Sequence, residues 1–391
     1  MKKVYLLALT SFPDIGGVQT SILSCAQKLV ERGFDVEVIS GCFHEAEQKK
    51  FQYKGVIFNK FYVKPSRLPL YNEVKIISAF TSFVNKNNFN FNDSVIFSRS
   101  VLFSYGCIRL KVKDVITLLP TITSLDFSGR SHFKKNVKDV ISSIFFKLNK
   151  CFYQYIESVV IRNSDIVVFS SLMKESIENK NTGKKVSVVL PGVDDEYFIK
   201  NNSDNKNGKV LFVGRIANNK NIYHLVDIIE KTPNEIFFTI AGDGPDEKKL
   251  KLYIEKKKLS KRVSFVGKKN QEELIELYKQ HSLTILPSKI ETFGLTIIES
   301  MACGTPVIAY NPDGNIVKTA SNEIIIDGHN GFLVKNYNDK EMASRIYQSL
   351  NYIKLNEDLF KNNCINYVNE KYNWNNIVNH LVLKAQNDRE N

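Results

Sequence analysis

Short apolar runs alternate with longer segments of helical periodicity along the first half of the chain. The run Val4–Leu9 predicts a buried strand, and a helix is predicted from about Val18 to Arg32, where Gly33 ends it. Phe34–Ser40 then predicts the second strand. Because strands and helices alternate, this half is predicted to consist of parallel βαβ units. Its further strands are predicted at Ser94–Phe97, Val115–Leu119, Asp165–Ser170 and Val186–Leu190.

A second alternating series follows the polar stretch Lys200–Gly208, whose composition is typical of a linker. Its strands are predicted at Lys209–Gly214, Ile236–Ala241, Val263–Val266, Leu283–Pro287 and Val307–Tyr310. The whole pattern predicts an α/β protein of two Rossmann-like domains, residues 1–192 and 193–374, with the ligand site in the cleft between them.

Length and composition agree with this organisation. A chain of 391 residues exceeds what one hydrophobic core usually supports, and its 43% hydrophobic and 24% charged residues are ordinary for a soluble protein. The six cysteines are scattered, which favours a reducing cytoplasm and no structural zinc. Met1–Thr10 only superficially resembles a secretion signal, because its short apolar run enters Pro13, so a first strand explains it better. No apolar run approaches the roughly 20 residues that a membrane span needs.

The net charge of +13 lies almost entirely in the first half of the chain. Residues 1–190 hold 27 Lys and Arg against 15 Asp and Glu, whereas the remainder holds 27 against 26. This asymmetry indicates either an anionic partner, such as a membrane surface or a phosphorylated acceptor, or a composition bias without functional meaning.

The most informative stretch places two carboxylates, Glu291 and Glu299, eight positions apart across a predicted strand-to-helix turn. Glu291 is expected in the loop that leaves the sheet, and Glu299 about two turns into a short buried helix, Leu295–Cys303. Between them, the N–H groups of Phe293 and Gly294 at a helix N-terminus favour an anionic group such as phosphate. Two acceptors for sugar hydroxyls beside a phosphate site are what a nucleotide sugar requires.

Two other turns follow the first strand of each half. Gly16 and Gly17 either allow a close backbone approach to a diphosphate or donor sugar, or form an ordinary turn. In the second half, Arg215 and Lys220 are suited to phosphate oxygens at the carboxyl end of the strand, with solvated loop charges as the alternative.

The turns Pro191–Asp194 and Gly242–Pro245 contain glycines that are expected to serve backbone geometry. A catalytic role for Asp194 or Asp243 is the alternative.

The order of these motifs, continued by Met301–Val307 and Asp327–Leu333, resembles glycosyltransferase family 4, which comprises retaining, nucleotide-sugar-dependent enzymes of the GT-B fold. The resemblance covers most of the chain and is strongest in the second half. Tyr372–Trp374 opens what is similar to the family's final helix, so residues 375–391 are expected to cross back onto the first domain.

The resemblance implies a donor site in the second domain. Glu291 would contact hydroxyls of the donor sugar, and Glu299 would bind the ribose. Arg215 and Lys220 would neutralise the leaving diphosphate. Backbone N–H groups near Phe293, Gly294 and Leu295 would add to the phosphate site. The backbone at Gly267 would lie near the base.

The mechanism that the resemblance implies is front-face substitution with retention, in which the leaving diphosphate helps to take the acceptor proton. No metal and no bound cofactor is expected, because Arg and Lys would neutralise the leaving group and the chain has no Asp-x-Asp triplet.

One departure from the family concerns the acceptor side. The family commonly carries a His after a strand of the first domain, where this chain has Val115–Thr121. Among the nearby polar residues, Asp126 could accept a hydrogen bond from an acceptor or sugar hydroxyl, or it could be an N-cap or loop carboxylate. His132 lies further along.

The basic, aromatic stretch Gly129–Lys138 runs into the Phe-rich helical segment Val140–Ile156. The two interpretations are a peripheral membrane-docking face and one long core helix with solvated lysines. A second basic and aromatic patch, Lys60–Arg67, is expected to be a loop near the acceptor.

We therefore expect a hexosyltransferase that uses a UDP-sugar in preference to a GDP-sugar and extends a cell-surface glycan or an anionic, lipid-linked acceptor, in the cytoplasm or on the inner face of the plasma membrane. A non-catalytic GT-B subunit that binds a partner is the alternative. Nucleic acid is not an expected partner, because only the charge suggests it and no recognition motif accompanies that charge.

Overall fold

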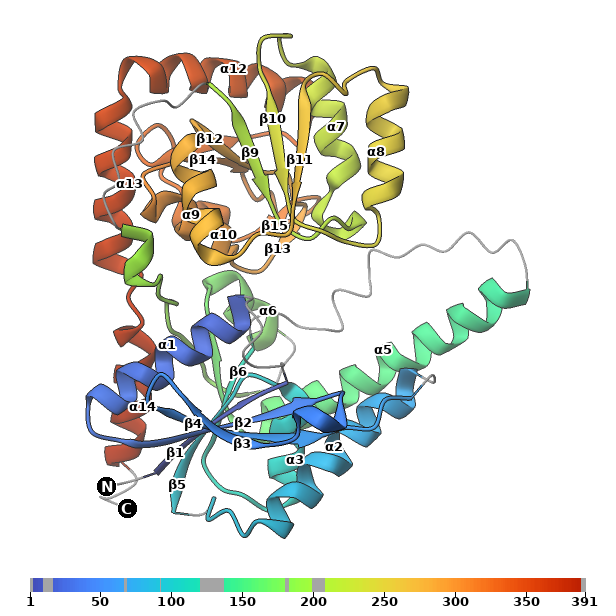
Figure 1. Cartoon of the computed structure of the whole chain (residues 1–391), viewed down its shortest axis with the longest axis vertical. Helices are drawn as coiled ribbons and strands as arrows, with labels where there is room; N and C mark the ends of the chain where they lie inside the picture. Colours follow the sequence, from blue (N-terminus) through green and yellow to red (C-terminus); the bar gives the residue numbers. More distant parts are fainter. Residues whose placement is uncertain are drawn as a thin grey trace. The chain divides into compact units, whose positions relative to one another are not determined.

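The structure, a computed structural model, describes residues 3–9, 17–66, 69–91, 93–119, 137–179, 183–198 and 208–387. The chain divides into two compact units (Figure 1). Unit 1 comprises Met1–Pro191 together with Trp374–Asn391, and unit 2 comprises Gly192–Asn373.

Unit 1 is built on an eight-stranded sheet in the order β3-β4-β2-β1-β5-β6-β7-β8. Neighbouring strands are parallel except in the hairpin β3–β4. The strands predicted for this half are present, with ends that differ by one or two residues. The bounds are β1 Lys3–Ala8, β2 Asp35–Cys42, β3 Lys50–Tyr53, β4 Val56–Tyr62, β5 Ser94–Ser98, β6 Val115–Leu118, β7 Asp165–Val168 and β8 Val186–Val188.

The loop expected at Lys60–Arg67 is wrong for its first three residues, because β4 continues to Tyr62. This strand is paired on both sides, with β2 and with β3, and the Lys60 side chain is buried. The hairpin turn has positive φ at both Lys54 and Gly55, which is the geometry of a two-residue type I′ turn.

The helices of unit 1 cover both faces of its sheet. Helices α2, α3 and α5 pack against one another, and their core includes stacked Phe80 and Phe103 rings 4.6 Å apart. Helix α14 packs on α1 and β5, and Arg32 donates hydrogen bonds to Asn375 and Asn379. The bounds are α1 Gly17–Glu31, α2 Pro69–Lys86, α3 Val101–Arg109, α5 Val137–Asn163, α6 Ser171–Glu178 and α14 Asn375–Asn387.

Unit 2 is built on a six-stranded parallel sheet in the order β11-β10-β9-β12-β14-β16. A small parallel pair, β13–β15, lies outside it. All five strands predicted for this half are present. The bounds are β9 Val210–Val213, β10 Phe238–Ala241, β11 Val263–Gly267, β12 Leu283–Leu286, β13 Ile290–Glu291, β14 Val307–Tyr310, β15 Lys318–Thr319 and β16 Gly331–Val334.

Helix α7 packs against α12 and α8, and this layer shares one apolar core with the sheet. The helices of unit 2 are α7 Ile222–Lys231, α8 Glu247–Lys256, α9 Gln271–Gln280, α10 Leu295–Ala302, α11 Ser321–Ile324, α12 Asp339–Leu355 and α13 Glu357–Lys371, with a 3-10 turn η3 at Asp195–Phe198 and another, η4, at Asn218–Lys220. In the described part of the chain, no helix is both long and apolar enough to cross a membrane.

Candidate functional site

The strand order of unit 2 reverses between β9 and β12. From β9 the chain moves outward through β10 to β11, and from β12 it moves the other way through β14 to β16. Ligands of open α/β sheets bind at such a switch point, outside the carboxyl ends of the strands. A ligand site of this unit is therefore expected at the segments that leave β9 and β12.

An ion pair joins these two segments. Lys220 lies in η4, after β9, and its Nζ lies 2.5 Å from Oε2 of Glu291, in β13, after β12. The Lys220 side chain is 31% exposed and that of Glu291 is 14% exposed. The sequence thus named two residues 71 positions apart that the fold brings into contact at the switch point.

The turn that carries Arg215 is held by the loop after β10. The N–H of Ile216 donates to the carbonyl oxygen of Asp243 at 2.7 Å. Gly242 has a φ of +138°, and a β-carbon there would lie 1.9 Å from the carbonyl oxygen of Gly214. Only glycine allows this contact, so the Gly242 turn serves backbone geometry. Arg215 itself is exposed at the carboxyl edge of the sheet.

Helix α10 begins beside the ion pair. Gly294 precedes its first residue, Leu295, with a φ of +85°, and a β-carbon at Gly294 would lie 3.3 Å from Cγ of Glu291. The first N–H groups of a helix have no partner within the helix, so they can bind an anion. Phe293 is buried, and its ring packs on that of Tyr372 at 5.9 Å.

Glu299 lies in the second turn of α10, closer to its start than the two turns expected from the sequence. The buried Tyr278 hydroxyl donates to Oε2 of Glu299 at 3.2 Å. Burial raises the pKa of Glu299 to about 7, with a contribution from the charge of Asp194, while the Tyr278 hydrogen bond lowers it. The carboxyl group therefore changes charge near neutral pH.

Tyr278 is a residue of this site that the sequence reasoning missed. It lies on α9, and apolar helical spacing alone gives no sign that its hydroxyl meets a carboxyl group 21 positions away. Asp194 was expected to lie in a turn that serves backbone geometry, with a catalytic role as the alternative. It accepts a hydrogen bond from Gln271 at 3.2 Å and influences Glu299 electrostatically.

Gly267 ends β11 with a φ of +73° and accepts a hydrogen bond from the N–H of Gly242 at 2.8 Å. A β-carbon at Gly267 would meet no atom within 4 Å, so only the backbone conformation restricts this position. Gly267 therefore lies at the same carboxyl edge, two strands away from β9.

Of the site residues predicted in the first half, only Gly17 belongs to the part of the chain that the structure describes. Gly17 is the first residue of α1 in unit 1. Gly16, Asp126, His132 and most of Gly129–Lys138 lie outside the described residues. Among the residues that are described, no three His, Cys, Asp or Glu side chains form a group that could hold a metal ion.

Comparison with known proteins shows what the chain is similar to. The sequence profile described as "Glycosyl transferases group 1" matches residues 193–364. An uncharacterized glycosyltransferase of Methanocaldococcus jannaschii is 27% identical over 369 residues, which cover 94% of this chain and 93% of the relative.

Solved structures agree with the fold. Sucrose-phosphate synthase from Thermosynechococcus elongatus superposes over 100% of both chains with a TM-score of 0.78 at 18% identity. The Anabaena protein Alr3699/HepE, solved in complex with UDP-glucose, matches 99% of this chain and 100% of its own with a TM-score of 0.72 at 16% identity. The predicted α/β class with two Rossmann-like domains and the resemblance to family 4 are both confirmed. The chain is a glycosyltransferase with the GT-B fold that is similar to family 4, and residues 193–364 match the group 1 glycosyltransferases.

Proposed function

We propose that this glycosyltransferase transfers a hexose from a nucleotide sugar, UDP-linked in preference to GDP-linked, to a growing cell-surface glycan or an anionic, lipid-linked acceptor, with retention and without a metal ion. The observation that carries the donor part is the contact of Lys220 with Glu291 at the switch point of unit 2. The UDP-glucose bound to the similar Anabaena protein supports the choice of nucleotide.

In this proposal the donor lies along the carboxyl edge of the unit 2 sheet. Glu299 accepts hydrogen bonds from the ribose, and the N–H groups at Gly294 and Leu295 bind the phosphates together with Arg215. Lys220 provides a second cation for the leaving diphosphate. Because the ion pair uses only Oε2 of Glu291, the carboxylate has a second oxygen for a hydroxyl of the sugar.

The proposed reaction breaks the bond between the anomeric carbon and the diphosphate oxygen. The acceptor oxygen bonds to the same face of the anomeric carbon, and its proton passes to the departing diphosphate oxygen. The work left to the protein is to stabilise negative charge on the leaving group and to orient the two reactants. Arg215 and Lys220 supply that charge stabilisation. Three residues of unit 1 complete the proposal: Gly16 and Gly17 as backbone contacts of the diphosphate or donor sugar, and Asp126 as the hydrogen-bond acceptor of an acceptor or sugar hydroxyl.

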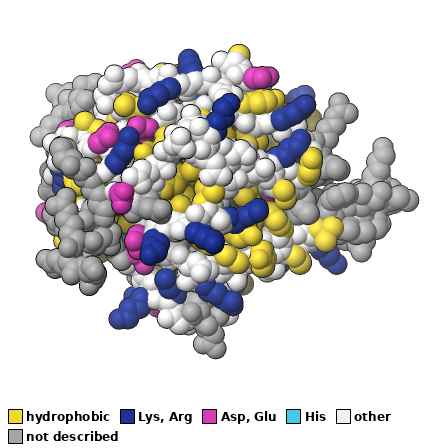
Figure 2. Space-filling model, turned by 90° about the horizontal axis from the view of Figure 1, so that it is seen from below, with side chains coloured by type: hydrophobic (Ala, Val, Ile, Leu, Met, Phe, Trp, Pro, Cys, Tyr) yellow, Lys and Arg dark blue, Asp and Glu magenta, His cyan; other side chains and the backbone are white. Residues whose placement is uncertain are grey.

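The acceptor part rests on the charge and surface of unit 1. The packed helices α2 and α5 both expose apolar side chains, and on α2 the Lys75 Nζ lies 4.7 Å from the Tyr71 ring centroid. Figure 2 shows Lys and Arg side chains scattered among hydrophobic ones on the face that it displays. Such a surface suits an anionic membrane. Among the side chains that the structure describes on these two helices, the large exposed apolar ones are Tyr71, Val74, Leu148 and Tyr155.

A panel of UDP-, GDP- and ADP-sugars tests the donor assignment through thermal stabilisation, because a bound donor raises the melting temperature by mass action. A UDP-hexose is expected to give the largest shift, and a panel without any shift would contradict the proposal. Hydrolysis or transfer by the purified chain alone would exclude the non-catalytic alternative.

The role of Glu291 is tested by Glu291→Gln, which keeps the shape of the side chain and removes its charge. Turnover should fall at least tenfold, while full activity would contradict the role. Glu255→Gln, at an exposed position on α8 of the same unit, is the matched control and should leave turnover unchanged.

Membrane docking is tested by sedimentation with vesicles of anionic phospholipid and, separately, of zwitterionic phospholipid. Binding to the anionic vesicles alone, weakened by Leu148→Glu, is the expected result. Equal recovery with both lipids would contradict an electrostatic membrane face.

A further inference from the structure

Asn221 lies between the two segments that carry the ion pair. It directly follows Lys220 and precedes α7 with a φ of +59° and a ψ of +34°, the left-handed conformation. Asparagine commonly caps a helix at this position by accepting an N–H with its side chain. The Asn221 side chain makes no such cap hydrogen bond.

The carboxamide of Asn221 is directed to two other segments instead. Its Nδ2 donates to the carbonyl oxygen of Pro287 at 2.7 Å and to the hydroxyl of Tyr337 at 2.6 Å. Both N–H bonds of the amide are thereby used. Pro287 directly follows β12 and lies four residues before Glu291, so one side chain connects the Lys220 turn to the Glu291 loop.

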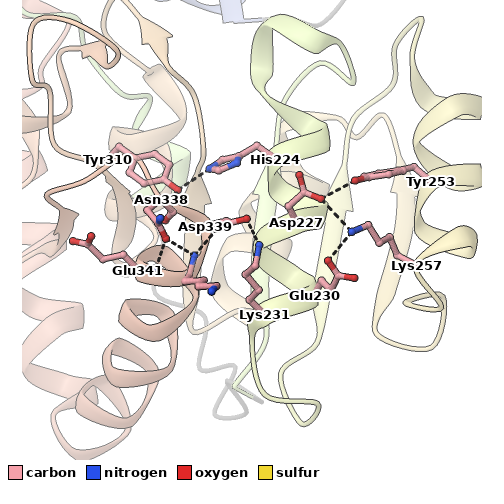
Figure 3. Close-up of polar contacts among 11 residues, drawn as sticks. His224, Asp227, Glu230, Lys231, Tyr253, Lys257, Tyr310, Asn338, Asp339 and Glu341 are labelled. Carbon is pink, nitrogen blue, oxygen red and sulfur yellow. Dashed lines mark hydrogen bonds and ion pairs between the residues drawn. The ribbon is translucent and has the colours of Figure 1, made fainter.

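Tyr337 is itself fixed in position. Its ring stacks on His224 of α7 with centroids 4.5 Å apart, and Lys289 Nζ lies 4.4 Å from its centroid. His224 is hydrogen-bonded to the Tyr310 hydroxyl at 2.8 Å, which donates to the carbonyl oxygen of Asn338 at 3.1 Å (Figure 3).

A second connection holds the same helices together. Lys231, at the end of α7, forms an ion pair with Asp339, the first residue of α12 (Figure 3). The Asn221 amide therefore donates to the hydroxyl of Tyr337, whose ring packs on α7. Helix α7 is in turn joined to β14 through His224 and to α12 through Lys231.

We propose that Asn221 is a positioning residue, whose two hydrogen bonds hold Lys220 and Glu291 in the relative placement that transfer requires. This inference rests on the proposed donor site. The leaving diphosphate and the sugar hydroxyls must meet the cation and the carboxylate together, and a displacement of about 1 Å between such groups can lower the rate by about 100-fold. Asn221 touches neither reactant and acts through its neighbours.

The chain offers a clean set of variants. Asn221→Gly keeps the left-handed conformation without strain and removes the amide, and Asn221→Asp keeps the size and removes both donors. Tyr337→Phe removes one of the two acceptors. Asn88→Gly is the matched control, because Asn88 is an exposed residue of unit 1 with a φ of +49°.

The experiment compares kcat with the donor found by the panel, the Kd values of UDP and UMP, and the melting temperature. Asn221→Gly and Asn221→Asp should lower kcat by about 10- to 100-fold. They should also weaken the binding of UDP more than that of UMP. In the proposed site Lys220 contacts the terminal phosphate of UDP, which UMP lacks. Tyr337→Phe should fall between these variants and the wild type, and Asn88→Gly should match the wild type.

Two results would overturn the inference. One is an unchanged kcat in both Asn221 variants, and the other is an equal loss of UDP and UMP affinity together with a lower melting temperature, which indicates a general structural role. A crystal structure of Asn221→Gly gives a reading that needs no donor: the separation of Lys220 and Glu291 should widen, and a retained 2.5 Å contact would refute the positioning role. A wild-type enzyme that binds no nucleotide sugar would contradict the proposed function instead.

Discussion

The carboxyl group of Glu299 should make nucleotide binding depend on pH in the neutral range. Its pKa is raised from 4.5 to about 7 by burial first and by Asp194 second, with the Tyr278 hydrogen bond acting in the opposite sense. The nearby hydroxyl of Tyr197 also has its pKa raised by burial, so it stays protonated and neutral over this range. One group near the proposed ribose position therefore titrates between pH 6 and 8.

The size of the effect follows from that pKa. If the ionised carboxylate is the form that accepts hydrogen bonds from ribose, about one tenth of the molecules are competent at pH 6 and about nine tenths at pH 8. The affinity for UDP should thus rise about tenfold over these two pH units, and binding should release a proton. Charge-assisted hydrogen bonds are worth roughly twice neutral ones, which justifies the preference for the ionised form.

The raised pKa of Glu299 also makes the free energy of unfolding depend on pH. This free energy falls as the pH rises, whereas the affinity for UDP increases. The folded protein holds the proton of Glu299 between about pH 4.5 and 7, where the unfolded chain has released it. The stabilising contribution is therefore fully present below about pH 4.5 and is lost as the pH rises through 7. One pKa unit corresponds to about 1.4 kcal/mol, so the whole effect is on the order of 3 kcal/mol.

Isothermal titration of UDP at pH 6, 7 and 8, in buffers of different ionisation enthalpy, measures both the affinity and the proton release. Since the terminal phosphate of UDP also titrates near pH 6, the comparison must be made with Glu299→Gln, which has the same shape and no titration. Only the difference between the two proteins reports on Glu299. A wild-type affinity with the same pH profile as Glu299→Gln would refute the reasoning.

Three further predictions follow from single contacts. Tyr278→Phe removes the hydrogen bond that lowers the pKa of Glu299, so the midpoint of the pH profile of UDP binding should move upward; a midpoint that stays or falls would contradict this. Gly242→Ala should destabilise unit 2 by several kcal/mol in urea unfolding, on the order of 3 or more, because its β-carbon would overlap a backbone oxygen, whereas Gly314→Ala, with φ of +74° and open space, should cost only about 1 kcal/mol. Lys220→Met should weaken UDP binding about tenfold or more and UMP binding far less, with little change in melting temperature because the ion pair is partly exposed; equal effects on the two nucleotides would be evidence against a diphosphate contact.

The pattern of apolar runs was sufficient for the class of fold and for five strands of the unit 2 sheet, but it missed β16, part of which was taken as a turn. Strands such as Leu283–Leu286 and Val307–Tyr310 are short, apolar and β-branched, and a parallel sheet that is covered on both faces requires such runs. The hairpin β3–β4 was missed because Lys60 and Asn59 interrupt its apolar pattern. Their side chains are buried, and that of Asn59 donates to Glu37.

The sequence by itself also predicted the residues of a nucleotide-sugar site, because Arg215, Lys220, Glu291 and Glu299 stand in the order that resembles family 4. Only the tertiary structure decided which of them meet. The reversal of strand order at β9 and β12 brings Lys220 to Glu291, and the packing of α9 on α10 places Tyr278 against Glu299. Contacts between residues far apart in the chain depend on strand order and helix packing, which no local pattern of side chains encodes.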